Sequence, residues 1–273
     1  MKLKRFANVF IYIVMLLLAV IYVFPFIMMV GGSFNKQSIF VPDPLIWIPK
    51  EVSLLNYSTI FSQGMVAKWF LNSAIISIVP VITTLLICSA VGYIFAKKKF
   101  HGSKTFFWIF MAVLMVPSQL TLIPRYIMYS KFNWIDTFWA FLIPGMWSVM
   151  FMFLMKQYIS TIPDSLIDAA NIDGCGDFII FFRIIIPLSK SALATVATFT
   201  FMNKWNDFMN PLIYTSDSTM YNIVVGFASL LQRTANFGIQ MASAVVSFIP
   251  IFILFLFFQK YFTEGIVLTG IKG

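Results

Sequence analysis

Long uninterrupted apolar runs constrain this chain more than any other feature. Six of them are close to the ~20 residues that an α-helix needs to cross a bilayer. The predicted spans cover residues 10–30, 70–96, 106–123, 138–155, 193–214 and 240–258. Because their apolar residues are continuous and do not alternate with polar ones, they predict helices rather than barrel strands. The sequence therefore predicts an all-α integral membrane protein with one transmembrane domain over residues 1–273.

The composition agrees with a membrane protein and offers little for catalysis. Hydrophobic residues make up 60% of the chain and charged residues 11%, outside the range of ordinary soluble domains. The single histidine, His101, has no paired Ser, Cys or carboxylate cluster, and Cys88 and Cys175 have no metal-ligand spacing. We therefore expect a protein that is not an enzyme and that has neither a metal site nor a disulfide.

The basic residues predict which loops face the cytoplasm. Six spans place both termini on one side, and the segments on that side hold twelve lysines and arginines against six in the opposite loops. Basic residues mark the cytoplasmic side, so the net charge of +9 needs no nucleic-acid partner. We predict that the N- and C-termini and the loop over residues 156–192 are cytoplasmic.

Within that loop, residues 158–190 are the only long, mostly non-membrane segment in the second half of the chain. Pro163 and Asp164 favour the start of a short helix, through a fixed φ and side-chain capping, and Gly174 favours its end. Helical spacing then gathers one face, formed by Leu166, Ala169, Ala170 and Asp173. Small alanines would let a partner surface approach this face closely.

A second helix is expected after the glycine, over residues 178–186. Asp177 is suited to cap its start and Pro187 to end it. Its apolar side is expected to lie against the membrane domain and consists of Phe178, Phe181, Phe182 and Ile185.

The loop contains Asp168-Ala169-Ala170, then Gly174, and nine residues later Ile184-Ile185-Ile186-Pro187. This spacing resembles the EAA loop of permease subunits in binding-protein-dependent ABC importers. Asp168 stands where that family usually has Glu, and Ile186 where it often has Leu. The resemblance runs over nearly the whole chain and is strongest to the smaller maltose-type permease subunit of the carbohydrate group. Further matching stretches are Trp47-Ile48-Pro49, Leu54-Leu55-Asn56-Tyr57, Asn72-Ser73, Ile123-Pro124 through Thr137, and Lys260 through Gly273.

The resemblance implies a type I ABC importer permease fold of six transmembrane helices, in the cytoplasmic (inner) membrane of a bacterium or archaeon. It implies half of a heterodimeric pore, completed by a second permease subunit and supplied with sugar by an extracytoplasmic solute-binding protein. The residues implied to couple the chain to a cytoplasmic ATPase dimer are Asp168, Ala169, Ala170, Asp173, Gly174 and Pro187. The chain has no G-x-x-x-x-G-K-[ST] phosphate loop, so we expect ATP and Mg on that ATPase and no cofactor on this chain.

The first external loop, residues 31–69, combines prolines with aromatic residues. Such a loop suggests a shaped surface, and an inert structured loop is the alternative. The candidates for docking the binding protein are Trp47, Pro49 and Tyr57.

Polar residues interrupt the fifth predicted span. Counting ~1.5 Å per residue from Leu193 places Asn203 about 15 Å into the span, near the middle of the bilayer. Carboxamides, a carboxylate and an indole suit the hydroxyls and ring faces of a sugar. The candidates for lining a substrate pathway are Asn203, Trp205, Asn206, Asp207 and Asn210. Two structural alternatives stay open, an ion pair between Lys204 and Asp207 and an asparagine row that binds a partner helix.

The sequence thus predicts a permease subunit of an ATP-driven carbohydrate importer. One alternative is an ABC permease for a non-sugar solute such as a polyol or glycerol phosphate. The other is a self-contained secondary transporter, which should show internal repeats and ionisable residues at the membrane midplane. No convincing repeat is visible, and the cytoplasmic loop would then have no function.

Overall fold

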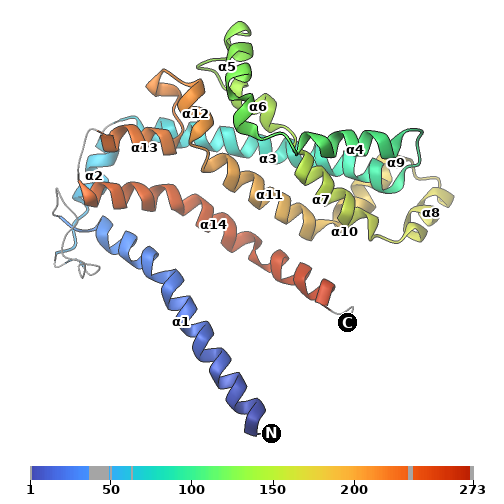
Figure 1. Cartoon of the computed structure of the whole chain (residues 1–273), viewed down its shortest axis with the longest axis horizontal. Helices are drawn as coiled ribbons and strands as arrows, with labels where there is room; N and C mark the ends of the chain where they lie inside the picture. Colours follow the sequence, from blue (N-terminus) through green and yellow to red (C-terminus); the bar gives the residue numbers. More distant parts are fainter. Residues whose placement is uncertain (1, 37–48, 50, 63, 233–235, 271–273) are drawn as a thin grey trace. The chain divides into compact units, whose positions relative to one another are not determined.

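The computed structural model describes residues 2–36, 49, 51–62, 64–232 and 236–270, and these are largely helical (Figure 1). The longest helices are α1 (Lys2–Ser33), α3 (Val66–Lys97) and α14 (Phe237–Gly270). The others are α2 (Leu55–Ser62), α4 (Ser103–Val113), η1 (Ser118–Thr121), α5 (Leu122–Lys131), α6 (Trp139–Gly145), α7 (Val149–Ser160), α8 (Asp164–Ile172), α9 (Asp177–Ile180), η2 (Phe181–Ile185), α10 (Ile186–Leu188), α11 (Lys190–Trp205), α12 (Met209–Tyr214), η3 (Ser218–Met220) and α13 (Ile223–Gln232).

Four helical stretches in the described part of the chain are long and apolar enough to cross a membrane. They are Asn8–Ser33, Val66–Lys97, Trp139–Ser160 and Phe237–Tyr261. Two further helix pairs pass the same test only when joined. One pair is Ser103–Val113 with Ser118–Lys131, bent by 84°, and the other is Asp177–Leu188 with Lys190–Trp205, bent by 80°. The number of spans is therefore four, or six if each bent pair counts as one, and the predicted six stays a prediction.

Two of the predicted spans are sharply bent at a break, and a third, residues 138–155, has a short break between α6 and α7. In residues 106–123, α4 ends at Val113, and Pro117, which has no N–H to donate, precedes the 3₁₀ turn of η1. In residues 193–214, α11 ends at Trp205 and α12 begins at Met209. A continuous helix through residues 206–208 was the wrong expectation, because Asp207 accepts a hydrogen bond from the backbone N–H of Asn210 and so favours a fresh helix start.

The chain divides into two compact units. Unit 1 comprises Met1–Ala67 and Gly226–Pro250. In it, α1 packs on the first half of α14, with ring centroids of Phe26 and Phe248 5.0 Å apart. The buried side-chain amide of Asn56 donates to the backbone oxygens of Ser33 and Asn35, both at 2.9 Å. This asparagine therefore ties α2 to the end of α1.

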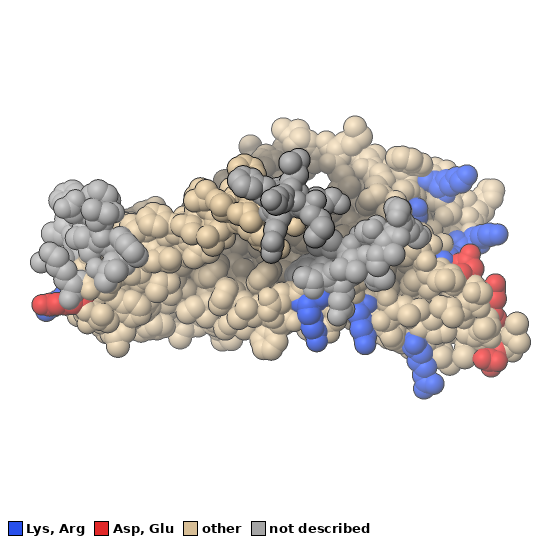
Figure 2. All heavy atoms as spheres, turned by 90° about the horizontal axis from the view of Figure 1, so that it is seen from below, with Lys and Arg blue, Asp and Glu red and all other residues tan. Residues whose placement is uncertain are grey.

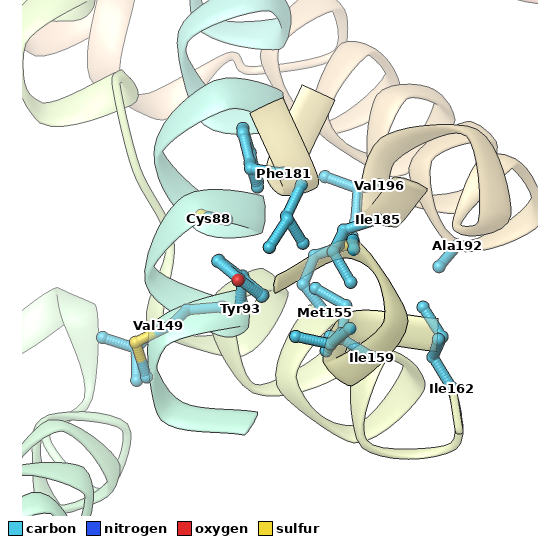
Figure 3. Close-up of a cluster of buried hydrophobic side chains, with 14 residues drawn as sticks. Cys88, Tyr93, Val149, Met155, Ile159, Ile162, Phe181, Ile185, Ala192 and Val196 are labelled. Atoms are coloured by element: carbon cyan, nitrogen blue, oxygen red, sulfur yellow. The ribbon is translucent and has the colours of Figure 1, made fainter. Parts of the chain in front are cut away.

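Unit 2 comprises Lys68–Val225 and Ile251–Gly273 and holds the main hydrophobic core (Figure 3). Met155 and Ile159 of α7 belong to this core together with Ile180 and Ile185 of the α9–η2 segment, and all four are fully buried. Further members come from α3, α8 and α11. The predicted cytoplasmic loop is thus built into the core of unit 2.

The start of α3 is fixed by two polar side chains. The amide of Asn72 donates to the backbone oxygens of Thr219 and Tyr221, at 2.8 and 3.0 Å. The hydroxyl of Ser73 accepts from the backbone N–H of Ile223 at 2.7 Å. Both side chains are buried, so these bonds satisfy backbone groups that water does not reach.

A valine at Gly92 is expected to destabilise unit 2, because α3 and α7 touch there. An added Cβ would lie 2.9 Å from both the backbone nitrogen of Lys156 and the Cβ of Met155. Relieving that contact should cost about 1–3 kcal/mol of unfolding free energy. Thermal unfolding of the purified Gly92→Val variant in detergent measures the loss. Gly176→Val is the matched control, because nothing lies within 4 Å of an added Cβ there. Equal melting temperatures for the two variants would contradict the close approach.

Candidate functional site

The loop predicted to be cytoplasmic contains the expected first helix and its glycine end. Helix α8 spans Asp164–Ile172, and Gly174 adopts the left-handed φ of +79°. The N–H of Gly174 donates to the oxygen of Asn171, and that of Cys175 donates to the oxygen of Ala170. These two bonds form a Schellman motif, whose left-handed position favours glycine because glycine has no Cβ.

The outward face of α8 differs from the predicted one. Ala170 is 7% exposed and packs in the core with Ile167, so it does not share an outer face with Leu166 and Ala169. Of the predicted outer face and the loop motif, the residues that stay exposed on and after α8 are Leu166, Asp168, Ala169, Asp173 and Gly174. The prediction of two outward alanines is wrong for Ala170, because a nine-residue helix on a packed core has to turn one stripe inward.

The second helix is longer than expected. The α9–η2–α10 segment runs through Pro187 to Leu188, and Ser189 separates it from α11. Pro187 lies on the first turn of the short α10, where a proline is tolerated, and it remains exposed. Phe181 and Ile185 are buried as predicted, but Phe178 is 76% exposed. The predicted apolar side is therefore only half covered by this chain.

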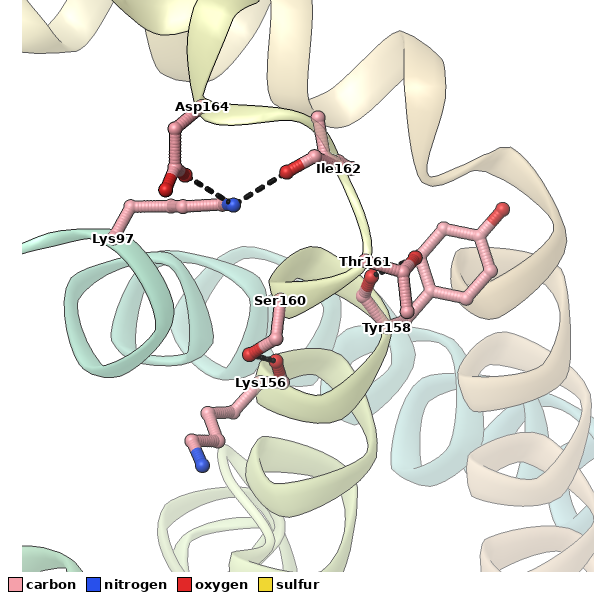
Figure 4. A network of polar contacts seen from close by, with 7 residues as sticks. All are labelled: Lys97, Lys156, Tyr158, Ser160, Thr161, Ile162 and Asp164. Carbon is pink, nitrogen blue, oxygen red and sulfur yellow. Dashed lines mark hydrogen bonds and ion pairs between the residues drawn. The ribbon is translucent and has the colours of Figure 1, made fainter.

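Lys97, the last residue of α3, and Lys98, which follows it, hold the two helices of the loop, and Figure 4 shows the contacts of Lys97. The ammonium group of Lys97 donates to the backbone oxygen of Ile162 and, at 2.6 Å, to the carboxylate of Asp164. The ammonium group of Lys98 pairs with the carboxylate of Asp177. The predicted capping roles of Asp164 and Asp177 are wrong, because neither helix start has a side-chain cap and both carboxylates face lysines. We call these two ion pairs the lysine clamp.

In the lysine clamp, the pKa shifts of Asp164 and Lys98 both favour the charged form. The hydrogen bond from Lys97 lowers the pKa of the Asp164 carboxyl, and the hydrogen bond to Asp177 raises the pKa of Lys98. A carboxyl with a lowered pKa keeps its contribution to stability above its ordinary pKa and loses it as the pH falls through the lowered value. A lysine with a raised pKa keeps its contribution below its ordinary pKa and loses it as the pH rises through the raised value. Neither loss occurs near pH 7.

A polar cavity of about 270 Å³ lies between α3, α11 and the break between α6 and α7. Its lining residues are Thr84, Gly145, Trp147, Ser148, Phe151, Thr200, Asn203 and Lys204. The hydroxyl of Thr84 donates to the backbone oxygen of Gly145, whereas the buried hydroxyl of Thr200 has no hydrogen-bond partner among the described residues. A side-chain amide, an ammonium group and free hydroxyl capacity in one cavity suit a polyhydroxylated ligand.

Asp207 and Asn210 line a second, smaller cavity of about 70 Å³ together with Arg125 and Lys204. The carboxylate of Asp207 accepts from the Asn210 side chain at 2.7 Å, so these two residues mainly satisfy each other. The ion pairs of the described residues join Lys36 to Glu51, Lys97 to Asp164 and Lys98 to Asp177. The alternative of a Lys204–Asp207 ion pair is therefore wrong, although both side chains face the same cavity.

Two of the predicted pathway residues lie elsewhere. Trp205 is 1% exposed, with its ring stacked on Phe201 at 5.3 Å and set edge-on to Phe70, so its faces are not open to a sugar. Asn206 is exposed at the end of α11 and lines neither cavity. The break after Trp205 separates Asn203 from Asn210, so the asparagines of this segment do not form one row on a single continuous helix.

The predicted docking residues of the external loop are only partly visible. Trp47 lies outside the described residues, and Pro49 is half-buried. The hydroxyl of Tyr57 donates to that of Ser33 at 2.8 Å, and its ring packs against Phe34. Tyr57 therefore contacts its own chain, and its docking role stays a prediction.

Several residues of these sites were not singled out by sequence reasoning. In the sequence, Lys97 and Lys98 serve only as markers of the cytoplasmic side. Their aspartate partners lie 67 and 79 residues further along the chain, so no local pattern signals these contacts. Thr84 and Thr200 look like ordinary residues of apolar spans. Only the packing of α3 against α11 and α7 reveals that they share a cavity.

Residues 88–267 match the family model described as binding-protein-dependent transport system inner membrane component. The chain is 36% identical over 260 residues to the arabinooligosaccharides transport system permease protein AraQ of Halalkalibacterium halodurans, covering 94% of this chain and 93% of that protein. It is 29% identical over 286 residues to the polygalacturonan/rhamnogalacturonan transport system permease protein YtcP of Bacillus subtilis, covering 99% of both. Its fold matches a chain of a bacterial ABC transporter involved in the import of the acidic polysaccharide alginate, with a TM-score of 0.82, 20% identity and 96% and 98% coverage.

Proposed function

The chain belongs to the family of binding-protein-dependent transport system inner membrane components, and from this we propose that it is a permease subunit of an ATP-driven importer for an oligosaccharide or a related sugar. The all-helical type I ABC importer permease fold agrees with this membership. Relatives named for arabinooligosaccharides and for polygalacturonan or rhamnogalacturonan support a carbohydrate as the substrate.

The main support for the proposal comes from residues 158–190, which we call the coupling loop. It presents an exposed helix face on α8 and is tied to α3 by the lysine clamp. Helix α3 in turn contributes Thr84 to the polar cavity. Movement of α8 by a cytoplasmic ATPase dimer would therefore reach the cavity through one rigid helix. In this proposal ATP and Mg bind the ATPase, and the exposed Asp168, Ala169 and Asp173 contact it.

The polar cavity supports a shared substrate site. Its volume of about 270 Å³ is just below the ~300 Å³ at which pockets for small ligands usually begin. We therefore infer that a second permease subunit supplies the rest of the pathway and that the two form a heterodimeric pore. Lys204 and Asn203 of this chain would contact the hydroxyls of the sugar.

The orientation follows from the basic residues. Both termini and the coupling loop would be cytoplasmic, in the cytoplasmic membrane of a bacterium or archaeon. The external loop of residues 31–69 would then face an extracytoplasmic solute-binding protein. That protein and ATP would act on the same equilibrium between inward-open and outward-open pores.

Reconstitution tests the proposal directly. Proteoliposomes with this chain, a second permease and the ATPase are expected to accumulate labelled arabinooligosaccharide only with ATP inside and binding protein outside. Omitting any one component should reduce uptake to background. Uptake by the purified chain alone, driven by a sodium or proton gradient, would instead identify a secondary transporter. Uptake of glycerol phosphate or a polyol in preference to the sugar would identify the non-sugar alternative.

A further inference from the structure

A large apolar groove lies between the second half of α3 and the α9–η2 segment. Its volume is about 620 Å³, and its lining atoms are mostly apolar. The residues that line it are Leu86, Ile87, Ala90, Tyr93, Ile94, Lys98, Asp177, Phe178, Phe181 and Phe182. Leu86, Ile94 and Phe178 remain more than 40% exposed there. The groove is therefore an open apolar surface on unit 2, apart from the polar cavity.

The length of the groove matches one leaflet of a bilayer. Its lining extends along α3 from Leu86 to Lys98, the residue directly after the helix, which at ~1.5 Å per residue is about 18 Å. One half of the ~30 Å hydrocarbon core of a bilayer is about 15 Å thick. In the predicted orientation, Lys98 lies at the cytoplasmic headgroup level and Leu86 near the bilayer middle. An extended acyl chain of the cytoplasmic leaflet fits these limits.

The charged end of the groove can receive a headgroup. Lys98 and Asp177 form an ion pair at this end, and an ammonium group has three donors, of which Asp177 takes one. Lys99 and Arg183 are exposed next to groove residues along the chain. Figure 2 shows blue and red side chains together at the end of the molecule that carries α8 and α9. Basic pockets at the cytoplasmic level favour anionic lipid headgroups.

The wall of the groove also contains an unsatisfied polar group. Tyr93 is 4% exposed, and its hydroxyl has no hydrogen-bond partner among the residues that the structure describes. The ammonium group of Lys98 lies 5.6 Å from the centre of the same ring. A buried hydroxyl without a partner is uncommon, and here the ring that carries it lies in the groove wall beside the cation. A lipid phosphate or glycerol ester oxygen would provide an acceptor near the cation.

We propose that this groove binds one anionic phospholipid of the cytoplasmic leaflet, with an acyl chain along Leu86, Ile94 and Phe178 and the headgroup phosphate on Lys98. A bound lipid would contact α3 and α9 at once and would share Lys98 with Asp177 of the coupling loop. Membrane lipid composition would thereby influence how firmly the loop is held. The site differs from the sugar pathway in place and in chemistry.

Native mass spectrometry of the full-length chain, delipidated in detergent and titrated with phosphatidylglycerol or phosphatidylcholine, tests the proposal. The wild-type chain is expected to retain one phosphatidylglycerol and to prefer it to phosphatidylcholine. Lys98→Gln should reduce this preference about fivefold. Asp177→Asn should raise the affinity for phosphatidylglycerol, because it removes the competing carboxylate. A loss of binding in both variants would mean that the ion pair only supports the fold, and would overturn the proposal.

A second pair of variants tests the groove itself. Ile94→Trp places a bulky ring in the groove and should reduce lipid retention about tenfold. Ile82→Trp is its matched control on the same helix, since Ile82 is exposed but does not line the groove. Lys131→Gln controls for loss of charge alone. Equal retention in both tryptophan variants would exclude the groove as the site.

The same lipid titration on the complex of this chain with its second permease tests whether that subunit, rather than a lipid, covers the groove. Retention of phosphatidylglycerol by that complex supports the lipid site. Retention by the isolated chain but not by the complex would show that the partner covers the groove, and the lipid proposal would then be wrong. These lipid-binding measurements do not depend on transport. The proposed transport function is tested separately by uptake in the reconstituted proteoliposomes, so the two proposals can fail independently.

Discussion

Lys97→Glu is expected to lower ATP-driven uptake about tenfold or more while the ATPase still binds and hydrolyses ATP. Lys97 joins the start of α8 to the end of α3, and its side chain is only 5% exposed. A glutamate there repels Asp164 and leaves the backbone oxygen of Ile162 without its donor. Movements of α8 would then no longer reach α3. Coupling energies between sites of ~1–3 kcal/mol correspond to effects of about 5- to 150-fold.

The measurement compares sugar uptake with ATP hydrolysis in the same proteoliposomes. Lys99→Glu is the matched control, because Lys99 is the exposed neighbour and forms no ion pair among the described residues. Adding Asp164→Lys to Lys97→Glu restores opposite charges and should recover part of the uptake. If the single variant transports normally, the lysine clamp has no part in coupling. If it fails to bind the ATPase, its role is in assembly.

Asn203→Leu is expected to raise the sugar concentration for half-maximal uptake about tenfold or more. Asn203 lines the 270 Å³ cavity, and its amide supplies both a donor and acceptors to a hydroxylated ligand. A leucine of similar size removes these groups and leaves the hydroxyls of the sugar unpaired, at a cost of ~1–3 kcal/mol for each lost partner. Uptake at several sugar concentrations measures the shift.

Asn206→Leu makes the same chemical change three residues away and serves as the control. Asn206 is exposed at the end of α11 and lines neither cavity, so its uptake should stay within about twofold of the wild type. Thr200→Val should act in the same direction as Asn203→Leu, because it removes the hydroxyl that has no partner within the chain. If Asn206→Leu raises the sugar concentration for half-maximal uptake more than Asn203→Leu does, the pathway lies beyond the break that follows Trp205.

The sequence predicts local features of the coupling loop well, because they depend on neighbouring residues. The helix at Asp164 and its end at Gly174 follow from propensity and from the left-handed conformation that glycine permits. The burial of Ala170 does not follow, since which stripe of a short helix turns inward is decided by the core that it meets. The same reason hides the lysine clamp, whose partners are 67 and 79 residues apart.

The polar segment of the fifth predicted span shows a different limit. Its composition singles out Asn203, which lines the cavity, and the role of Asn203 in a substrate pathway stays a prediction. The apolar pattern over residues 193–214 predicts one continuous helix, but the break after Trp205 separates Asn203 from Asn210. The side chain of Asp207 supports that break by a hydrogen bond to a backbone N–H three residues on. Such a local competition between side chain and backbone is difficult to weigh against a strongly apolar helical pattern.

The π segment at Phe181–Ile185 gives the spacing of the loop motif a physical meaning. A π turn closes its hydrogen bonds over five residues instead of four, so it contains one residue more than an α-helical turn in the same place. The nine residues between Gly174 and Ile184 include most of this segment. The spacing between Gly174 and Ile184 therefore includes an inserted residue. Without it, Asp177 at one end and Pro187 at the other would be rotated relative to each other by about one residue of helix, or roughly 100°.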